Sequence, residues 1–230
     1  MIIVESKRKK AATILKNYPD AILADVTSSA KDGLVKLSPF YPHYGIPVPF
    51  SEGYTATCVE AIWQGLKVFE SCDVDVEMFK NDTMKNIKRT VRRFGRPLGH
   101  RKGVNGTELL GYIEARKQIY IPTYKWVLEN KVANIIERLR EASKTKTIVL
   151  LDYDTNADVE NAKKPLSHAS LIKAYVEGIY PYGDYKPSAQ SKEDRKSPQT
   201  EAGEKKPPKA KRKKKPKKED NNMQLELFNE

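Results

Sequence analysis

The stretch 57–69, TCVEAIWQGLKVF, constrains the fold of this chain more than any other segment. Its apolar side chains recur at about 100° per residue, which places them on one arc of a helix. Three small residues, Cys58, Ala61 and Gly65, occupy the opposite side and would let another backbone approach closely. The spacing therefore predicts a helix that is buried nearly all round, with the rest of the domain packed around it.

The only charged or amide side chains between positions 58 and 69 are Glu60, Gln64 and Lys67, spaced i, i+4, i+7. Because an unpaired charge is unfavourable inside a core, this polar stripe is expected to line a pocket. A second interpretation stays open. Thr57 and Glu60 fit the capping box S/T-x-x-E, and Glu60 with Lys67 would then form a thin solvent-exposed edge of the helix.

Composition bounds the rest of the chain. The 230 residues suffice for one medium-sized domain with its own core. From about Asp184 onward, apolar residues give way to Pro, Lys, Ser and Glu. Residues 186–230 hold 14 Lys and Arg against 8 Asp and Glu, so the net charge of +12 divides equally between this tail and the remainder. Both parts favour polyanionic partners.

Targeting signals and cysteines point to a compartment. The first residues lack the layout of a signal peptide, and no apolar run approaches the length of a membrane span. The two cysteines, Cys58 and Cys72, fit a reducing compartment without disulfides. The expectation is a cytoplasmic protein with no membrane partner, and a bacterial or phage-infected host cell is implied only by a resemblance of residues 224–228 given below.

The pattern of elements predicts an α+β fold that is richer in helix than in strand. Expected strands are 2–5, 21–26 and 146–153, and expected helices are 6–17, 57–69, 81–93, 107–118, 122–132, a further helix to about 143, and 167–177. The prolines between 37 and 50 forbid a regular central strand. They indicate an extended segment that forms a pocket wall or only covers the core.

Polar side chains follow the strand expected at 146–153, KTIVLLDY. Asp152, Asp154 and Asn156 emerge at its carboxyl end, which is a common place for ligands. Asp154 is predicted to point into the same pocket as Glu60, whereas Asp152 is expected to be more structural.

Glycines at 95, 99, 103 and 106 mark a turned loop that also carries basic side chains, among them Arg96 and Arg101. Such a loop can bring backbone N–H groups and arginine side chains onto phosphates. Its spacing matches neither the dinucleotide fingerprint nor the P-loop, and an ordinary solvated basic loop explains it equally well.

Several of these segments together resemble the NADAR superfamily, the YbiA-like N-glycosidases. Residues 37–42, LSPFYP, resemble that family's LSNF-Y-P segment, and residues 57–67 resemble its TVEH…QAQK helix. The pair 95–96 is similar to a GR pair, and residues 124–131, YKWVLENK, are similar to the family's KF-QN helix. The resemblance covers about residues 34–177.

The chain also departs from that family pattern. Pro39 stands where Asn is usual, Leu66 stands where Gln is usual, and IVLLDYDTN occupies the region of the family's late WG-G segment. The expected organisation is an N-terminal β-α-β extension at 1–33, a NADAR-like catalytic domain at 34–183, a disordered Lys/Pro-rich linker at 184–222 and a clamp-binding-like peptide at 223–230.

The resemblance implies an enzyme that cleaves the N-glycosidic bond between ribose C1 and a base or amine. Members of the superfamily act on phosphoribosyl-amine metabolites or on ADP-ribosylated guanine in nucleic acid, and the second substrate is expected here. The matched motifs place Glu60 and Lys67 in the catalytic centre, with Asp154 as the acid at the far end. Expected substrate-binding residues are Phe40, Tyr41, Trp63, Gln64, Arg96 and Asn156. No metal or other cofactor is expected.

The chemistry of the two stripe residues agrees with part of this implication. A lysine amine can attack a sugar C1 and hold it as a Schiff base if burial lowers its pKa. Glu60 could carry protons to the base and to the opened sugar. An ionised Glu60 would favour the charged form of Lys67, so the pair is expected to titrate together and share a proton.

A competing motif lies at residues 148–155, IVLLDYDT, which match the hhhhDxDxT opening of haloacid-dehalogenase-type phosphatases. There the first Asp is a nucleophile and both acids hold magnesium. That fold needs a full α/β domain after the motif, and little folded sequence remains here. The DxDxNxD run also resembles a calcium loop, but it lacks the central Gly and the terminal Glu.

The tail carries a second signal. Residues 184–222, with KPPKAKRKKKPKK at their centre, have the composition of a disordered polybasic linker that contacts DNA phosphates. The apolar island 224–228, QLELF, resembles the peptide by which bacterial polymerases and repair proteins dock on the sliding clamp. Its expected clamp-binding side chains are Gln224, Leu225, Leu227 and Phe228. The alternative to an enzyme is therefore a non-catalytic DNA-accessory protein that binds the clamp.

Overall fold

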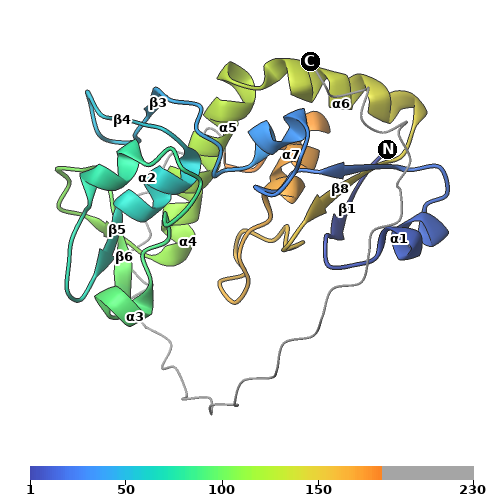
Figure 1. The fold of residues 1–230 in the computed structure, drawn as a ribbon. Coiled ribbons are helices and arrows are strands. Elements are labelled where there is room, and N and C mark those ends of the chain that lie inside the picture. Colours follow the sequence, from blue (N-terminus) through green and yellow to red (C-terminus); the bar gives the residue numbers. More distant parts are fainter. Residues whose placement is uncertain (183–230) are drawn as a thin grey trace, which may run out of the picture.

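The computed structural model describes residues 1–182, which form one mixed α+β domain (Figure 1). The predicted fold class is confirmed. The linker at 184–222 and the peptide with Gln224, Leu225, Leu227 and Phe228 lie outside the described residues. Within residues 1–182, none of the helices combines the length and the apolar character that crossing a membrane requires.

The elements follow one another along the chain, with the longest connection between β8 and α7. The strands are β1 (Ile2–Ser6), β2 (Ile22–Asp25), β3 (Ile46–Pro47), β4 (Thr55–Ala56), β5 (Lys67–Phe69), β6 (Pro97–Arg101), β7 (Leu109–Leu110) and β8 (Ile148–Asp152). The helices are α1 (Ala11–Asn17), α2 (Val59–Gly65), α3 (Val91–Phe94), α4 (Tyr112–Ala115), α5 (Ile121–Asn130), α6 (Ala133–Thr145) and α7 (His168–Val176). Short 3₁₀ turns lie at Gly33–Leu37 and Val76–Lys80, and a π-helical turn at Arg116–Tyr120 joins α4 to α5.

Three parallel strands form the sheet drawn at the right of Figure 1, in the order β1-β8-β2. The central strand β8 reads IVLLD and is buried along almost its whole length, as expected for a parallel strand covered on both faces. Val149 packs with Ile14 of α1 on one face, whereas Ile148 and Leu150 join the main core on the other. Residues 1–33 are therefore no appendage, because β8 from the far end of the chain lies between their two strands.

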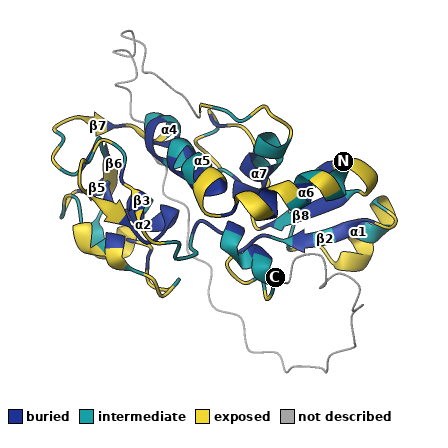
Figure 2. Cartoon of the chain, turned by 90° about the horizontal axis from the view of Figure 1, so that it is seen from above, coloured by how far each residue is buried: buried dark blue, intermediate teal, exposed yellow. Residues whose placement is uncertain are grey.

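Two smaller antiparallel sheets, β3-β4 and β5-β6-β7, lie at the opposite side of the molecule beside α2. The continuous helical run α4 to α5 passes between the two sides, and its Tyr124 is fully buried with its hydroxyl donating to the carbonyl of Leu37 at 2.6 Å. Figure 2 shows β8 mostly buried and β2 partly buried, while the outer side of α6 is exposed. The domain thus places α2 and the carboxyl ends of the parallel strands around a shared interior.

The predicted helix at 57–69 is too long. It begins at Val59 and ends at Gly65, and Lys67 is the first residue of strand β5 rather than part of the helix. Gly65 packs so closely against Phe79 that an added Cβ would lie 2.3 Å from its ring. Since glycine also disfavours helix continuation, while the β-branched and aromatic sequence KVF favours a strand, the chain changes conformation here.

The capping-box interpretation is wrong. The residue that caps α2 is Cys58, whose Sγ accepts from the backbone N–H of Ala61 at 3.4 Å. The Thr57 hydroxyl instead donates to the carbonyl of Asn81 at 2.6 Å. The hydroxyl and Glu60 therefore do not close a reciprocal cap, and Glu60 is free to face another part of the structure.

The helix predicted at 81–93 is reduced to the single turn α3. The Asn81 side chain accepts from the N–H of Thr83 at 3.1 Å and donates to the carbonyl of Lys85, which folds a local turn in place of a helix. Met84 and Asn86 have φ values of 56° and 55°, which no right-handed helix permits. The Asn81 side chain therefore stabilises a turn over residues 81–85 and does not cap a helix, as its sequence position had suggested.

Other predicted elements vary in accuracy. The strands at 2–5, 21–26 and 146–153 are confirmed as β1, β2 and β8, and Ser167 caps α7 by accepting from Ser170 N–H. The helix predicted at 6–17 begins only at Ala11, and that predicted at 107–118 begins at Tyr112. The loop predicted at 95–106 contains strand β6, in which Gly99 lets the carbonyl of Leu110 approach.

Candidate functional site

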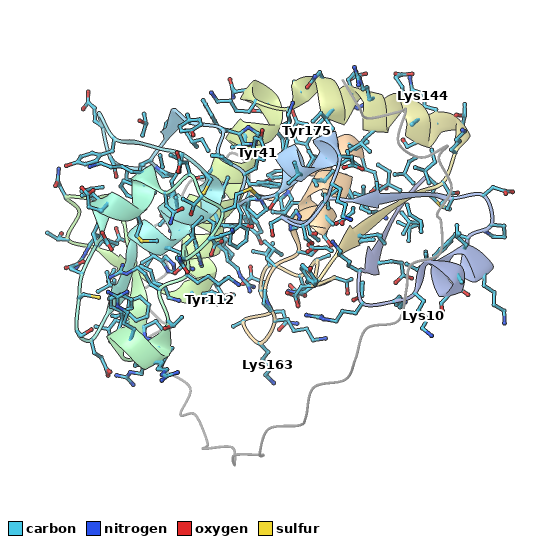
Figure 3. The ribbon with its side chains drawn as sticks, viewed as in Figure 1. Lys10, Tyr41, Tyr112, Lys144, Lys163 and Tyr175 are labelled. Carbon is cyan, nitrogen blue, oxygen red and sulfur yellow. The ribbon has the colours of Figure 1, made fainter. Side chains whose placement is uncertain are left out.

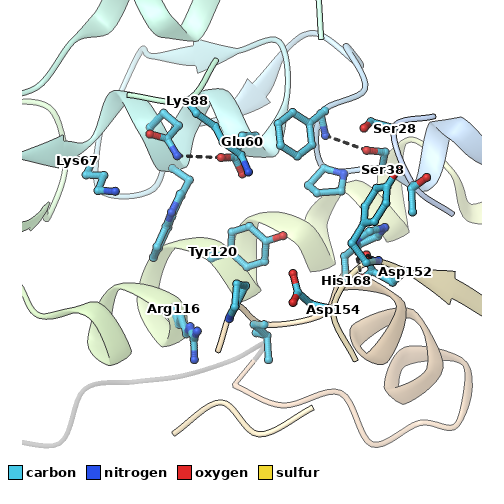
Figure 4. Close-up of a pocket in the computed structure, with 18 of the residues that line it drawn as sticks. Ser28, Ser38, Glu60, Lys67, Lys88, Arg116, Tyr120, Asp152, Asp154 and His168 are labelled. Carbon is cyan, nitrogen blue, oxygen red and sulfur yellow. Dashed lines mark hydrogen bonds and ion pairs between the residues drawn. The ribbon is translucent and has the colours of Figure 1, made fainter. Parts of the chain in front are cut away.

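A cavity of about 620 Å³ opens between α2 and the carboxyl edge of the β1-β8-β2 sheet (Figure 4). Its volume is in the range of small-molecule sites. Its lining comes from segments that are far apart in the chain. The lining residues are Arg8, Thr27, Ser28, Ser38, Pro39, Phe40, Glu60, Trp63, Gln64, Lys67, Lys88, Arg89, Thr90, Val91, Tyr112, Arg116, Tyr120, Asp152, Tyr153, Asp154, Pro165, Leu166 and His168.

Glu60 projects from the first turn of α2 into this cavity. Only 8% of the residue is exposed, so it is not the solvent edge of a helix. Its backbone N–H donates to the carbonyl of Pro39 at 2.9 Å, and its Oε1 accepts from Gln64 Nε2 at 2.8 Å. Desolvation raises the pKa of Glu60, although the Gln64 hydrogen bond and the charges of Lys88 and Lys67 oppose this rise. A carboxyl in this environment keeps its proton to a higher pH than an exposed glutamate does.

Lys67 is half-buried and lies at the α2 end of the cavity, where Figure 4 labels it. Desolvation and the neighbouring charges of Arg89 and Lys88 lower its pKa, with Glu60 acting in the opposite direction. No carboxylate among residues 1–182 lies within ion-pair distance of its Nζ. A lysine held in this way has a larger fraction of neutral, nucleophilic amine than an exposed one.

Arg89 fixes the relative position of the residues around it. Its guanidinium donates to the carbonyls of Gln64, Lys67 and Asp73, and its backbone N–H donates to Gln64 Oε1 at 3.0 Å. It is 5% exposed, and no carboxylate among the described residues pairs with it. Its positive charge therefore acts directly on Lys67. Its backbone N–H holds Gln64 Oε1, so that the amide nitrogen of Gln64 faces Glu60.

An aromatic wall closes the same end of the cavity. The Trp63 ring lies 3.7 Å from His100, 5.9 Å from Tyr112 and 5.6 Å from Tyr120, measured between ring centroids. His100 is 1% exposed, and burial together with the charge of Lys67 lowers its pKa to about 3. The imidazole is thus neutral at physiological pH and supports the Trp63 ring from behind.

Arg116 ties the long connection between β8 and α7 to the helical run below the cavity. This buried guanidinium donates to the carbonyls of Val159, Asn161 and Lys164 and to the hydroxyl of Tyr112. Arg116 begins the π-helical turn, and such turns are often found at functional sites. These hydrogen bonds of Arg116 hold in place the loop that carries Asp154.

The opposite end of the cavity is a fully bonded network. Asp152 Oδ2 accepts from the Ser167 hydroxyl at 2.8 Å and lies 3.0 Å from His168 Nδ1, while Oδ1 accepts from the N–H of Tyr153 at 2.7 Å. Desolvation opposes ionisation of Asp152, but the hydrogen bonds and charge of its partners outweigh it and lower its pKa. The other nitrogen of His168 lies 2.8 Å from the carbonyl of Val26. Asp152 therefore joins β8, α7 and the loop after β2.

Six of the nine residues predicted for catalysis or substrate binding line the cavity: Glu60, Lys67, Asp154, Phe40, Trp63 and Gln64. Asp154 is half-buried and lies across the open space from Glu60 in Figure 4, so the structure brings these two acids into one cavity. The roles assigned to all six remain predictions.

The structure does not bring the other three predicted residues, Tyr41, Arg96 and Asn156, into the cavity. Tyr41 packs beside His43 with ring centroids 4.9 Å apart, and Figure 3 shows it on the upper side of the molecule, away from Tyr112. Arg96, the exposed residue just before β6, pairs with Glu70. The Asn156 amide donates to the carbonyls of its own loop.

Several cavity residues had no clear signal in the sequence. Lys88 and Arg89 were placed in a helix that does not form, and Arg116 appeared as one more basic residue on a helix. Arg8 and Ser28 follow strands of the N-terminal segment, and only the pairing of those strands with β8 brings them to the site. Among residues 1–182, no group of three or more His, Cys, Asp and Glu side chains is placed to hold a metal ion.

The fold and the site define an α+β domain with a mixed polar and aromatic cavity in which basic lining residues outnumber acidic ones. The family model DUF6939, described as a family of unknown function, matches residues 6–172, and the chain belongs to that family. None of the curated proteins compared with the chain matches it.

Proposed function

We propose that the protein is an N-glycosidase that hydrolyses the ribose–base bond of ADP-ribosylated guanine in nucleic acid, or of a related ADP-ribose or phosphoribosyl N-glycoside. The observation that carries this proposal is the α2 end of the cavity. There a buried carboxyl with raised pKa lies in the same wall as a half-buried amine with lowered pKa, and no ion pair joins them. Opposed shifts of this kind separate an acid from a nucleophile.

The proposed reaction begins with neutral Lys67. Its amine lone pair forms a bond to ribose C1, and the bond from C1 to the base breaks with its electron pair on the base nitrogen. Protonated Glu60 gives its proton to the departing base. One amine proton passes to the ring oxygen as the ribose ring opens, which leaves a protonated imine on Lys67. Addition of water at C1 then releases the sugar and restores the amine.

The surrounding charges suit a phosphate-bearing substrate. Basic lining residues are Arg8, Lys67, Lys88, Arg89 and Arg116, whereas the acidic ones are Glu60, Asp152 and Asp154. Asp152 is already held by its own partners, so positive charge dominates the free space. Trp63 offers an aromatic face for a base, and Asp154 can accept hydrogen bonds from ribose hydroxyls.

The test is incubation of the full chain with DNA that carries ADP-ribosyl-guanine, followed by mass spectrometry of the released products. We expect loss of the ADP-ribosyl group and recovery of unmodified guanine in the DNA. The same incubation with free ADP-ribosyl-guanosine separates action on nucleic acid from action on a nucleotide. Intact substrate in both reactions would contradict the proposed action on ADP-ribosylated guanine.

The phosphatase alternative receives no support from the geometry at Asp152. Both oxygens of this carboxylate are engaged, Oδ2 by Ser167 and His168 and Oδ1 by the N–H of Tyr153. A nucleophilic aspartate needs an oxygen that faces the phosphate. The non-catalytic accessory protein remains the competing function, and it does not require Glu60 and Lys67 to act together.

We further propose that the tail holds the enzyme at replicating DNA, with the basic linker on phosphates and the peptide at 224–228 in a bacterial-type sliding clamp. The peptide 221–230 is expected to bind such a clamp with a micromolar Kd, about −8 kcal/mol. Changing Leu227 and Phe228 to Ala should remove binding, because these apolar side chains would fill the clamp pocket, whereas Glu226→Ala should hardly matter. Calorimetry with bacterial and phage clamps decides it, and equal heats from the double-Ala peptide would contradict the proposal.

A further inference from the structure

The carboxyl edge of the parallel sheet forms the half of the cavity that lies away from α2. β8 is the central strand, and β1 and β2 pair with its two opposite edges. Each of the three strands is followed by a loop that contributes to the cavity lining. Arg8 follows β1, Ser28 follows β2 and Asp154 follows β8. In open parallel sheets, ligands bind in the crevice where the loops of neighbouring strands diverge in this way.

The N-terminal segment 1–33 supplies one wall of this crevice. It lies outside the range over which the sequence resembles N-glycosidases, so the resemblance implies nothing about what this wall binds. Figure 4 shows Ser28 at the side of the cavity near Asp152 and His168, while Lys67 lies at the other side. A substrate that reaches both ends has one part at the α2 residues and another part at this wall.

Arg8 is a cation at the sheet edge of the crevice that has no ion-pair partner among residues 1–182. One Nη donates to the carbonyl of Tyr153 at 2.7 Å, and the guanidinium lies 5.7 Å from the centroid of the Tyr153 ring. These two contacts orient the guanidinium, and within residues 1–182 no carboxylate forms an ion pair with it. An oriented guanidinium with donors to spare matches the geometry of a phosphate group.

The neighbour of Arg8 provides an internal comparison. Lys7 is fully engaged, since its Nζ pairs with Asp25 and donates to the hydroxyls of Thr27 and Ser29. Ser28 lies between Thr27 and Ser29 in the loop after β2. It is exposed, and within the described chain its hydroxyl makes no hydrogen bond. The loop thus commits its other polar groups to the fold and leaves one hydroxyl open on the cavity side.

We propose that Arg8 and Ser28 at the carboxyl edge of the β1-β8-β2 sheet bind a phosphate of a nucleotide group that lies remote from the bond attacked by Lys67. The exposed ring of Tyr153 and the carboxylate of Asp154 flank this site and suit the base and the ribose hydroxyls of such a group. The statement that this group lies away from the cleaved bond rests on the proposed function. The binding of a phosphate by Arg8 and Ser28 does not depend on it. The N-terminal segment then selects substrates that extend beyond a single phosphoribosyl unit.

The experiment is calorimetric titration of the full chain with AMP and with adenosine, which measures binding without catalysis. We expect AMP to bind at least about tenfold more tightly than adenosine, because a charged hydrogen bond from arginine to phosphate is worth about this much. Arg8→Ala should reduce AMP binding to the level of adenosine, Arg8→Lys should restore part of it, and Ser28→Ala should weaken it by a smaller factor.

Two control variants locate the site. Lys16→Ala removes a positive charge from the exposed side of α1, outside the cavity, and should leave the AMP affinity unchanged. Lys67→Ala should also leave it unchanged, because Lys67 lies at the other end. Equal affinity for AMP and adenosine, no effect of Arg8→Ala, or a loss of AMP binding in Lys67→Ala would each overturn the proposal. Failure of the enzyme to cleave ADP-ribosylated DNA would leave these titrations unaffected, so the two proposals fail separately.

Discussion

Two buried carboxylates stand at opposite ends of one cavity and show opposite behaviour. Glu60 is 8% exposed and Asp152 is 5% exposed, so water is excluded from both to a similar degree. The pKa of Glu60 is raised and that of Asp152 is lowered. The difference lies in their partners. Glu60 has a single amide donor from Gln64, whereas Asp152 has Ser167, His168 and backbone N–H groups.

Burial by itself therefore does not say what a carboxylate does. Asp152 is ionised and joins three elements, which is the pattern of a structural anchor. Glu60 is under-bonded at the wall of a cavity and lies near an amine with lowered pKa, which is the pattern of a reacting group. The predicted contrast is therefore between a catalytic α2 end of the cavity, with Glu60 and Lys67, and a structural sheet end, with Asp152.

The largest effect is expected at Lys67. Lys67→Ala should reduce glycosidase activity to the level of a blank, because no other amine is predicted to reach ribose C1. Thermal or urea unfolding should change by no more than about 1 kcal/mol, since the side chain makes no ion pair within residues 1–182. Lys16→Ala on the exposed side of α1, outside the cavity, is the control and should retain activity. Cleavage by Lys67→Ala at the wild-type rate would remove the α2 end from catalysis.

Asp152→Asn should cause the largest loss of stability, on the order of 2–3 kcal/mol. The substitution removes a charge and an acceptor from a network in which the hydroxyl of Ser167 and the ring of His168 then lose their partner. Urea denaturation measures this loss. Because the wild-type pKa of Asp152 is lowered, its contribution is present above its ordinary value of 3.8 and disappears as the pH falls through the folded-state pKa. A variant as stable as the wild type at pH 7 would contradict the anchoring role.

Glu60→Gln should act in the opposite direction on stability. A raised folded-state pKa means that ionised Glu60 destabilises the fold above the ordinary value of 4.5, and that this destabilisation is complete only above the folded-state pKa. The variant should therefore gain on the order of 1 kcal/mol at pH 7 and show no gain below about pH 4. Its activity should fall by roughly 10²–10⁴-fold, the usual contribution of a general acid. A destabilised Glu60→Gln would mean that both acids are structural.

The sequence predicted the parts of this contrast that depend on residue type and local spacing. The short apolar runs indicated β1, β2 and β8, and the isolated polar residues on a buried stretch indicated Glu60 and Gln64 as cavity residues. Lys67 was placed in the cavity through a helical spacing that the structure does not have. It reaches the site from strand β5, which begins two residues after α2 ends at Gly65.

The parts that depend on long-range pairing could not be predicted. Nothing in the local sequence shows that β8 inserts between β1 and β2, so the contribution of Arg8 and Ser28 was invisible. Arg89 is surrounded by basic residues in the sequence, and only its contacts with three carbonyls distinguish it from them. Arg96 was predicted as a ligand residue from a two-residue match, but its own ion pair with Glu70 holds it outside the cavity.

The most direct measurement is reductive trapping. The full chain is incubated with ADP-ribosyl-guanine DNA and borohydride, and the protein is digested and analysed by mass spectrometry for a sugar adduct. The account predicts one adduct, on Lys67, present in the wild type and in Lys16→Ala and absent from Lys67→Ala. Base release by the wild type with no adduct on Lys67, or with the adduct on another lysine, would contradict the central role of the α2 end.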